Sequence, residues 1–151
     1  MDRPLIRAAR GDDVDALRDV FRRASLSNDA DRPLFDAHPE YLEWSPSARL
    51  DTRVAVVEGH VAGFASTSAG DDAVELDDLF VAPERMRSGV GRALVADAVE
   101  RARAAGATAI EVTGNEHAVA FYRAVGFVVV GSAPTAGPVA PRLRLDLASP
   151  R

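Results

Sequence analysis

Apolar residues in the first third of the chain predict one clear helix and a less regular segment. Val14, Leu17, Val20 and Phe21 recur at helical spacing, behind a short strand predicted at residues 5–7. Either of the two aspartates that precede Val14 can cap this helix. The next stretch is rich in Asp, Pro and Ser, and its segment PLFDAHPEYLEW predicts one or two short helices.

Alternating apolar positions predict three strands in the middle of the chain. The segment TRVAVVEGHVAGFASTSAG contains two strand-like runs joined at EGH, which is typical of a β-hairpin. The segment AVELDDLFVAP adds a third strand, which ends at Pro83 because proline cannot donate a hydrogen bond to a strand ladder. We expect these strands to form an antiparallel meander.

A stripe of apolar residues at Val90, Leu94, Ala98 and Ala102 predicts an amphipathic helix of about four turns. The strand TAIEVTG follows, then a second helix for which Asn115 is the expected N-cap, and finally the strands FVVVG and RLRLDL. A strand, a helix and a strand in succession imply a parallel pair joined by a crossover helix.

These elements predict an α/β (α+β) fold in a single domain spanning residues 1–151. A chain of 151 residues, of which 47% are hydrophobic, can bury a substantial core. We expect a mixed, mostly antiparallel sheet of about six or seven strands, with one central parallel pair and helices on both faces.

The composition excludes several chemistries. The chain has no cysteine, so it can form neither a disulfide nor a zinc–thiolate site and offers no thiolate nucleophile. Three scattered histidines give no reason to expect a metal site. The sequence shows no apolar leader and no stretch near the ~20 apolar residues of a membrane helix. We expect a cytoplasmic protein that binds no membrane.

The net charge of −5 at pH 7 argues against nucleic acid as a partner. Proteins that bind nucleic acid rely on basic patches, which release counterions from the phosphates. An acidic chain suits a cationic substrate better.

The segment ERMRSGVGRAL connects the third strand of the meander to the amphipathic helix. Unpaired N–H groups at a helix N-terminus attract an anion, and glycines let the backbone approach it closely. The segment therefore predicts a phosphate site, although a plain strand-to-helix turn is the alternative. The segment has neither the P-loop string nor the third glycine of a dinucleotide fingerprint, so we expect another pyrophosphate.

Two segments resemble the GNAT superfamily of N-acetyltransferases, which bind acetyl-coenzyme A. LDDLFVAPERMRSGVGRALV is similar to the family pattern V-x-P-x-x-[QR]-x-x-G-x-[GA], and NEHAVAFYRAVGF is similar to N-x-x-A-x-x-F-Y-x-x-x-G-F. Together they cover about residues 74 to 127, in the order and spacing of the family. The resemblance implies a GNAT fold and a direct transfer of the acetyl group from acetyl-CoA, the cosubstrate, to a primary amine, with no metal.

The resemblance also implies which residues bind the cosubstrate. Backbone groups of Phe80 and Val81 should receive the pantetheine arm, and the pyrophosphate should lie on the N–H groups of the following loop, from Arg87 through Ser88, Gly89, Val90 and Gly91 to Arg92. The chain departs from the family pattern at Met86, where Gln or Arg is usual, and at Arg87, where glycine is frequent. Arg87 either supplies the missing positive charge or is a solvated loop residue.

For the catalytic groups, the resemblance implies a proton donor at Tyr122, which would protonate the leaving thiolate, with packing in the core as the alternative. Asn115 is expected to bind the coenzyme, cap its helix, or both. Glu75 stands at the interval where some members carry the base that deprotonates the amine. Asp77, Asp78 and an ordered water chain remain rivals.

The motifs do not identify the acceptor, which we expect to be a small amine or a peptide. Its pocket should come from residues 26–50, including Phe35, Tyr41 and Trp44, and from the loop at residues 132–141. One rival function is a catalytically silent coenzyme-A-binding sensor or assembly module. Another is acetylation of aminoacyl-tRNA, which the acidic charge disfavours. A homodimer is left open.

Overall fold

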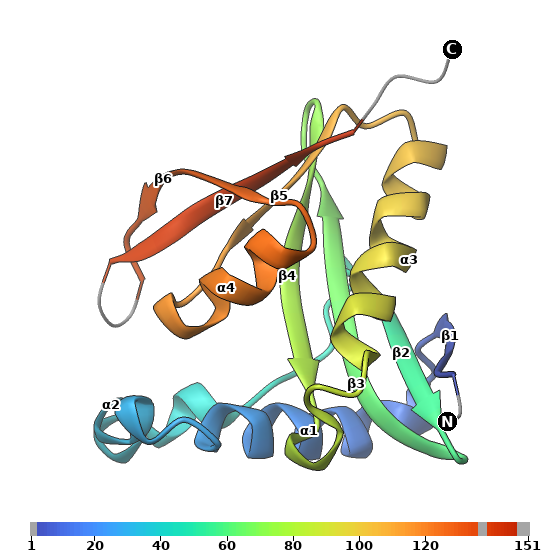
Figure 1. Cartoon of the computed structure of the whole chain (residues 1–151). Helices are drawn as coiled ribbons and strands as arrows, with labels where there is room; N and C mark the ends of the chain where they lie inside the picture. Colours follow the sequence, from blue (N-terminus) through green and yellow to red (C-terminus); the bar gives the residue numbers. More distant parts are fainter. Residues whose placement is uncertain (1–2, 136–138, 148–151) are drawn as a thin grey trace. The chain divides into compact units, whose positions relative to one another are not determined.

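The computed structural model describes residues 3–135 and 139–147. Within them the chain forms seven strands and four α-helices, and the strands make one mixed sheet in the order β1-β2-β3-β4-β5-β7-β6 (Figure 1). The elements are β1 (Leu5–Ala8), α1 (Val14–Leu26), α2 (Arg32–Ala37), β2 (Asp51–Val57), β3 (His60–Ala69), β4 (Ala73–Val81), α3 (Val90–Ala104), β5 (Ala109–Thr113), α4 (Val119–Ala124), β6 (Val128–Ala133) and β7 (Ala140–Asp146).

Strand pairing confirms the predicted fold class. β4 pairs with β5 in parallel, and α3 is the crossover helix between them. β1 with β2, β5 with β7, and β6 with β7 are antiparallel pairs. The turn between β2 and β3 has positive φ at both central residues, 52° at Glu58 and 79° at Gly59, as a tight hairpin with the right-handed strand twist requires.

The chain packs as two compact units. The first consists of Met1–Ser66 with Asp78–Leu94, and the second of Thr67–Asp77 with Val95–Arg151. The expectation of a single domain stays a prediction. No helix within the described ranges 3–135 and 139–147 is long and apolar enough to cross a membrane.

In the first unit, helices cover both faces of the sheet. Gly63 and Phe64 are neighbours on β3, so they point to opposite faces. Phe64 belongs to an apolar cluster with Leu17 of α1, whereas a side chain at Gly63 would point at Val90 and Leu94 of α3. The buried members of the cluster are Leu17, Val20, Trp44, Val54, Phe64 and Ala82.

In the second unit, β5 and β7 have one apolar and one charged face. Ile110, Val112 and Leu143 are almost fully buried. Tyr122 of α4 is buried as well and packs edge-on against Phe127, with ring centroids 5.4 Å apart. The residues between the buried ones carry charges and form the ion pairs described below.

Both predicted N-caps lie at cap positions, but neither side chain bonds the helix as expected. Asp13 directly precedes α1, yet its carboxylate accepts hydrogen bonds from Arg7 and from the backbone N–H of Arg10. Asn115 precedes a 3-10 turn (Glu116–Ala118) without a side-chain cap bond, and α4 begins only after that turn. In both places a short 3-10 turn precedes the α-helix and moves its start along the chain.

The Arg7–Asp13 ion pair ties β1 to the start of α1. The Arg7 guanidinium approaches both Asp13 oxygens, at 2.8 and 3.0 Å, and Asp13 is almost completely buried. The hydrogen bonds from Arg7 lower the pKa of Asp13 below its ordinary value. A lowered pKa in the folded state adds stability above the unfolded pKa of about 3.9, and this stability is lost as the pH falls through the folded value.

Replacement of Asp13 by Asn should therefore lower the free energy of unfolding at pH 7 by about 1–3 kcal/mol. The difference from wild type should shrink near pH 2–3, because there the wild-type carboxylate is increasingly protonated. Urea unfolding at both pH values measures this. Asp15→Asn is the control, since the Asp15 side chain is fully exposed. Equal losses for both variants, or a pH-independent loss at Asp13, would contradict the prediction.

Candidate active site

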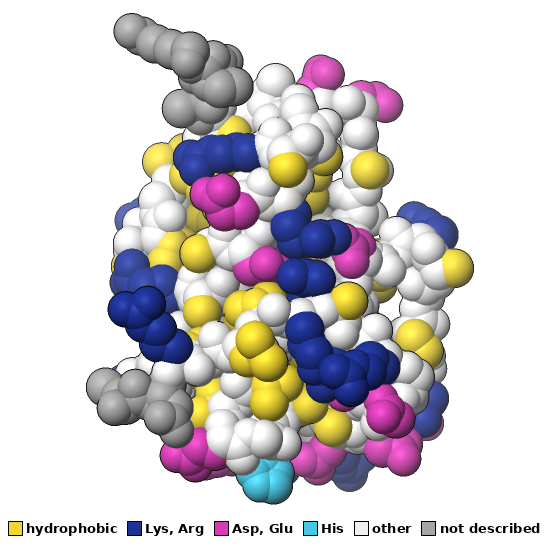
Figure 2. Space-filling model, turned by 90° about the vertical axis from the view of Figure 1, so that its right-hand side faces the viewer, with side chains coloured by type: hydrophobic (Ala, Val, Ile, Leu, Met, Phe, Trp, Pro, Cys, Tyr) yellow, Lys and Arg dark blue, Asp and Glu magenta, His cyan; other side chains and the backbone are white. Residues whose placement is uncertain are grey.

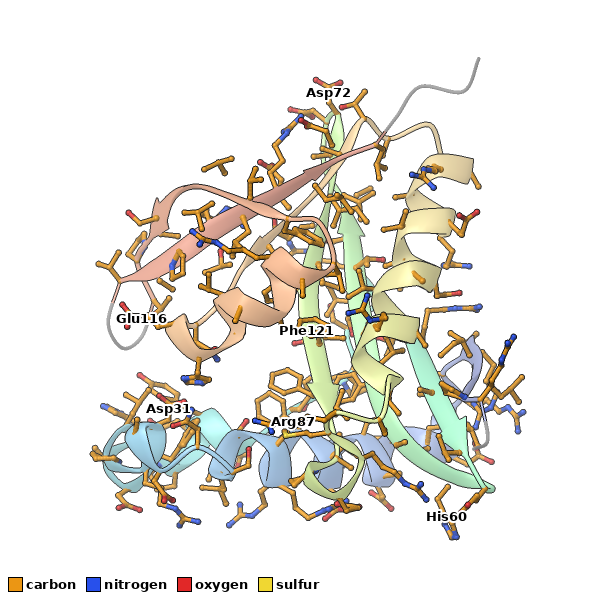
Figure 3. The ribbon with its side chains drawn as sticks, viewed as in Figure 1. Asp31, His60, Asp72, Arg87, Glu116 and Phe121 are labelled. Carbon is orange, nitrogen blue, oxygen red and sulfur yellow. The ribbon has the colours of Figure 1, made fainter. Side chains whose placement is uncertain are left out.

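The loop between β4 and α3 is exposed and contains two left-handed residues. Residues 86–89 are exposed, and φ is 63° at Arg87 and 92° at Gly89. Figure 3 labels Arg87 on this loop. The Ser88 hydroxyl donates a hydrogen bond to the carbonyl of Arg85 and closes the turn. Positive φ costs a residue with a Cβ about 1–2 kcal/mol, which explains why glycine is frequent at the position of Arg87 in the GNAT pattern.

Arg87 and Arg92 at this loop have no ion-pair partner among the described residues. Arg85, by contrast, pairs with Glu58 at 3.2 Å. Both are exposed, and the first turn of α3 contains no acidic residue. Two free positive charges therefore accompany the N-terminus of a 15-residue helix, an arrangement suited to an anion.

The end of β4 continues beyond its partner strand. Parallel pairing with β5 covers residues 73–76, whereas β4 runs on to Val81. On the other edge, the N–H of Ala82 bonds the carbonyl of Ala62 at 2.8 Å. Residues 77–81 thus lie beyond the β5 ladder, and their edge can accept an extended ligand as an additional strand.

Gly63 permits this arrangement, and the sequence patterns did not single it out. A Cβ at Gly63 would lie 2.8 Å from the carbonyl oxygen of Phe80 and 3.1 Å from the side chain of Val90. The end of β4 and the first turn of α3 can approach β3 this closely only because residue 63 has no side chain. An isolated glycine inside a strand pattern was the available signal.

Tyr122 has a buried ring and an accessible hydroxyl. Its exposed fraction is 6%, and burial raises the pKa of its phenol well above the ordinary value of 10.0. Every fully buried side-chain N or O atom in the described part of the chain has a hydrogen-bond partner, whereas no described residue bonds the Tyr122 hydroxyl. The hydroxyl oxygen therefore retains contact with solvent. It stays protonated at neutral pH and can act as a proton donor.

The Tyr122 ring fits against Gly114, another residue that the sequence analysis missed. A Cβ at Gly114 would lie 3.2 Å from the Tyr122 ring and 3.3 Å from Leu143. Gly114 precedes Asn115, which is exposed. The phenol thus owes its position to an absent side chain on the adjacent strand end.

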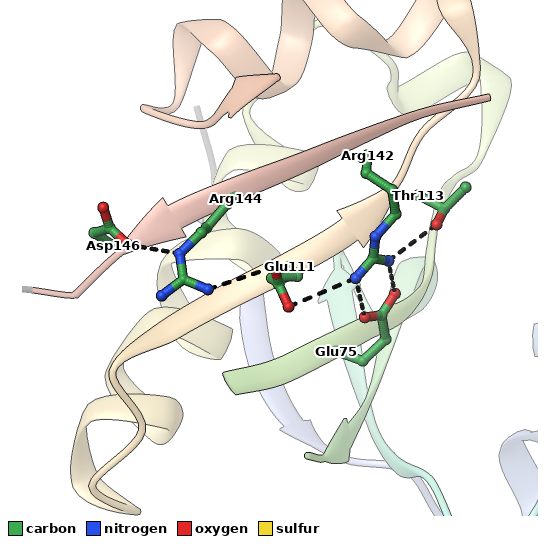
Figure 4. Close-up of polar contacts among 6 residues, drawn as sticks. All are labelled: Glu75, Glu111, Thr113, Arg142, Arg144 and Asp146. Carbon is green, nitrogen blue, oxygen red and sulfur yellow. Dashed lines mark hydrogen bonds and ion pairs between the residues drawn. The ribbon is translucent and has the colours of Figure 1, made fainter. Parts of the chain in front are cut away.

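Glu75 is ion-paired with Arg142 (Figure 4). The two guanidinium nitrogens of Arg142 contact the two carboxylate oxygens of Glu75 at 2.6 and 3.0 Å. Arg142 also donates to Thr113 at 3.0 Å and approaches Glu111 at 3.6 Å. Hydrogen bonding to Glu75 is the largest cause that raises the pKa of Arg142, so this guanidinium remains charged.

The two rival carboxylates on β4 have other partners. Asp77 accepts a hydrogen bond from the Ser68 hydroxyl at 2.6 Å, and Asp78 accepts one from the indole N–H of Trp44 at 3.2 Å. Trp44 packs on Phe64 at 5.1 Å between ring centroids. Trp44 was expected in the acceptor pocket, and its ring belongs to the core of the first unit while its N–H positions Asp78.

The other residues expected to line the acceptor pocket are more exposed than Trp44. Phe35 is partly buried on α2, and Tyr41 stacks on His38 at 4.6 Å. In the loop at 132–141, residues 136–138 lie outside the described residues. The first unit contains the loop and the strand end, and the second contains Glu75, Asn115 and Tyr122.

Charges are interspersed on the face drawn in Figure 2, where basic side chains lie next to carboxylates rather than in one basic patch. In the described ranges, no group of His, Asp and Glu side chains could hold a metal ion. The loop offers anion binding, and Tyr122 and the carboxylates of β4 offer proton transfer.

The contact between Gly114 and Tyr122 predicts the effect of a single methyl group. Gly114→Ala should lower the free energy of unfolding by about 1–3 kcal/mol, because the methyl would crowd the Tyr122 ring and Leu143. Gly131→Ala is a matched control, since a Cβ there would meet nothing within 4 Å. Thermal unfolding of both variants tests this, and equal melting temperatures would show that the ring is not held by this contact.

Comparisons with known proteins identify the family of the chain. Residues 14–127 match the model of the acetyltransferase (GNAT) family. The chain is 41% identical over 132 residues to streptothricin acetyltransferase of Streptomyces lavendulae, covering 79% of this chain and 69% of that protein.

Solved structures show the same fold. A nourseothricin acetyltransferase superposes with a TM-score of 0.62 at 28% identity, over 70% of each chain. The PaiA N-acetyltransferase of Thermoplasma acidophilum, in complex with coenzyme A, superposes with a TM-score of 0.75 at 14% identity, over 96% of this chain and 99% of that one. The chain thus belongs to the acetyltransferase (GNAT) family and is an N-acetyltransferase.

Proposed function

We propose that the chain transfers the acetyl group of acetyl-CoA to a primary amine of a small molecule or a peptide. The observation that carries this proposal is the loop between β4 and α3, where exposed backbone, positive φ and two arginines without an ion pair among the described residues meet a helix N-terminus. The pyrophosphate of acetyl-CoA fits this loop in charge and in chemistry. The coenzyme A bound by the Thermoplasma acidophilum relative supports the choice of anion.

Backbone groups bind the rest of the cosubstrate in this proposal. The segment of β4 that ends at Phe80 and Val81 lies beyond the ladder with β5. Its backbone groups that point away from β3 can pair with the amides of the pantetheine arm. The N–H groups from Arg87 to Arg92 hold the pyrophosphate, and Gly89 and Gly91 keep them accessible. The resemblance to the family also assigns the side-chain amide of Asn115 to the coenzyme.

The reaction needs one group that accepts a proton and one that donates a proton. The acceptor reaches the site as an ammonium and gives one proton to Glu75. Its neutral nitrogen then forms a bond to the acyl carbon as the carbon–sulfur bond breaks, and it releases its second proton to solvent as the amide forms. Tyr122 donates its proton to the leaving thiolate and recovers one from solvent. Asp77, Asp78 or a water chain could replace Glu75 as the base.

We propose a cationic acceptor. The net charge of −5 favours a positively charged ligand, and the Streptomyces lavendulae relative is named for acetylation of streptothricin. A thiol-release assay with acetyl-CoA tests the function across streptothricin, polyamines, aminoglycosides, amino acids and peptides. We expect release above background with at least one amine. Tight binding of acetyl-CoA without release on any amine would contradict the proposal.

Binding of the cosubstrate can be tested at Arg87. Acetyl-CoA should raise the melting temperature of the protein, because it binds only the native state, whereas ATP and NAD should not. Arg87→Gly and Arg87→Ala both remove the charge and should weaken acetyl-CoA binding about two- to fivefold in calorimetry.

Only Arg87→Gly also relieves the positive φ of 63°, so it alone should stabilise the free protein, by about 1 kcal/mol. Unchanged affinity in both variants would show that the phosphate binds elsewhere. Equal melting temperatures for the two would show that the backbone at residue 87 is unstrained.

Tyr122→Phe keeps the buried ring and removes only the hydroxyl. Folding and acetyl-CoA affinity should match wild type, and turnover should fall roughly 100-fold, the lower end for general acid catalysis, because a thiolate leaves fairly easily. Since burial raises the pKa of Tyr122 above 10.0, the phenol stays protonated and wild-type turnover should not decline below about pH 10 through Tyr122. Wild-type turnover in the variant would exclude Tyr122 as the proton donor.

A further inference from the structure

Arg142 already pairs with Glu75, the carboxylate that deprotonates the acceptor in the proposed mechanism. Two guanidinium nitrogens contact the two carboxylate oxygens, at 2.6 and 3.0 Å. A planar guanidinium that meets a carboxylate through two parallel hydrogen bonds is the strongest common form of this contact, and an ammonium cannot reproduce it. The carboxylate therefore already has a cationic partner in the free protein.

Residues on neighbouring strands hold Arg142 in place. The register sets Glu75 of β4 opposite Glu111 of β5, and Thr113 of β5 opposite Arg142 of β7. Arg142 uses one nitrogen for both Glu75 and the Thr113 hydroxyl, and its other nitrogen approaches Glu111 at 3.6 Å (Figure 4). Its orientation is thus fixed by three side chains on the same face.

The pair is also accessible to a ligand. The side chains of Arg142 and Glu75 keep 24% and 32% of their surface exposed. A cation from solvent can therefore reach Glu75 without unfolding of the sheet, but it must compete with a guanidinium already in contact.

We propose that Arg142 is a positioning residue that competes with the ammonium group of the acceptor for Glu75. This inference rests on the proposed function of Glu75. Arg142 holds the carboxylate in one orientation and weakens the binding of cationic acceptors, because part of the attraction of Glu75 and Glu111 is neutralised. Acceptor binding then requires Arg142 to yield at least one of its two contacts with Glu75.

The test uses steady-state kinetics with the amine that gives the highest kcat/KM in the thiol-release assay. Arg142→Met should lower KM for this amine roughly three- to tenfold, because Glu75 loses its guanidinium partner and Glu111 keeps only Arg144 among the described residues. Its kcat should fall, since Glu75 is no longer held in one orientation. Arg142→Lys keeps the charge but not the paired contacts, so its KM should fall less.

Arg144→Met is the matched control. Arg144 lies two residues further along β7 on the same face, carries the same charge, and pairs with Asp146 at 2.7 Å and Glu111 at 3.4 Å. Loss of Arg144 changes the net charge as much as loss of Arg142 but leaves the Arg142–Glu75 contact in place. The KM of Arg144→Met should therefore stay within about twofold of wild type. The difference between the two variants isolates the contact with Glu75 from general electrostatics.

The Glu75→Gln background provides the decisive comparison. If Arg142 acts through Glu75, then Arg142→Met should change KM little once Glu75 is neutral, so the two substitutions should be strongly non-additive. In the wild-type background, the fall in KM should also shrink as salt is added, because the interaction is between charges.

A merely structural role predicts the opposite sign, with a higher KM, a lower kcat and a lower melting temperature for Arg142→Met. A KM that rises, equals that of Arg144→Met, or falls equally in the Glu75→Gln background would overturn the inference while the acetyltransferase function stands. If Arg142→Met does not fold, Arg142→Lys decides, and an unchanged or raised KM in that variant overturns the inference. Absence of transfer to every amine would overturn both.

Discussion

The early end of the parallel ladder between β4 and β5 is the constraint on which the proposed site depends. Pairing covers residues 73–76, and β4 continues to Val81. Backbone N–H and C=O groups need partners wherever they are not in water, so an unpaired strand edge is a binding surface for an extended chain. Gly63 maintains the other edge of this segment by letting the Phe80 carbonyl come close to β3.

Some arginines are neutralised by ion pairs within the fold, whereas others keep a positive charge that a ligand can use. Arg7 bonds the nearly buried Asp13, and Arg23 bonds Glu84 at 2.6 Å. By contrast, Arg87 and Arg92 have no ion pair with any residue between 3 and 135 or between 139 and 147. An acidic protein can thus still offer a local anion site, because net charge says little about which side chains are already neutralised. Backbone donors at the helix terminus add to the same local field.

The two proposed catalytic residues, Tyr122 and Glu75, are each positioned by a neighbouring residue that takes no part in the proposed reaction. Tyr122 is positioned by the missing side chain of Gly114, and its solvent contact at the hydroxyl is what keeps a buried phenol useful as a donor. Glu75 depends on Arg142, which lies 67 residues away in the sequence. In both cases the sequence identified the candidate catalytic residue but not the neighbouring residue that positions it.

The sequence by itself determined the elements, the fold class, the family and the position of the loop between β4 and α3. Strand and helix periods are local properties, and the two GNAT-like motifs lie in short contiguous segments, so β4, α3 and the residues from Arg87 to Arg92 could be located without coordinates. The tertiary structure decided the partners of each charge. The Arg142–Glu75 contact arises from the register of β4, β5 and β7, and the caps at Asp13 and Asn115 were displaced by 3-10 turns. Strand register depends on cross-strand packing over the whole sheet, a non-local property that neither residue type nor spacing reveals.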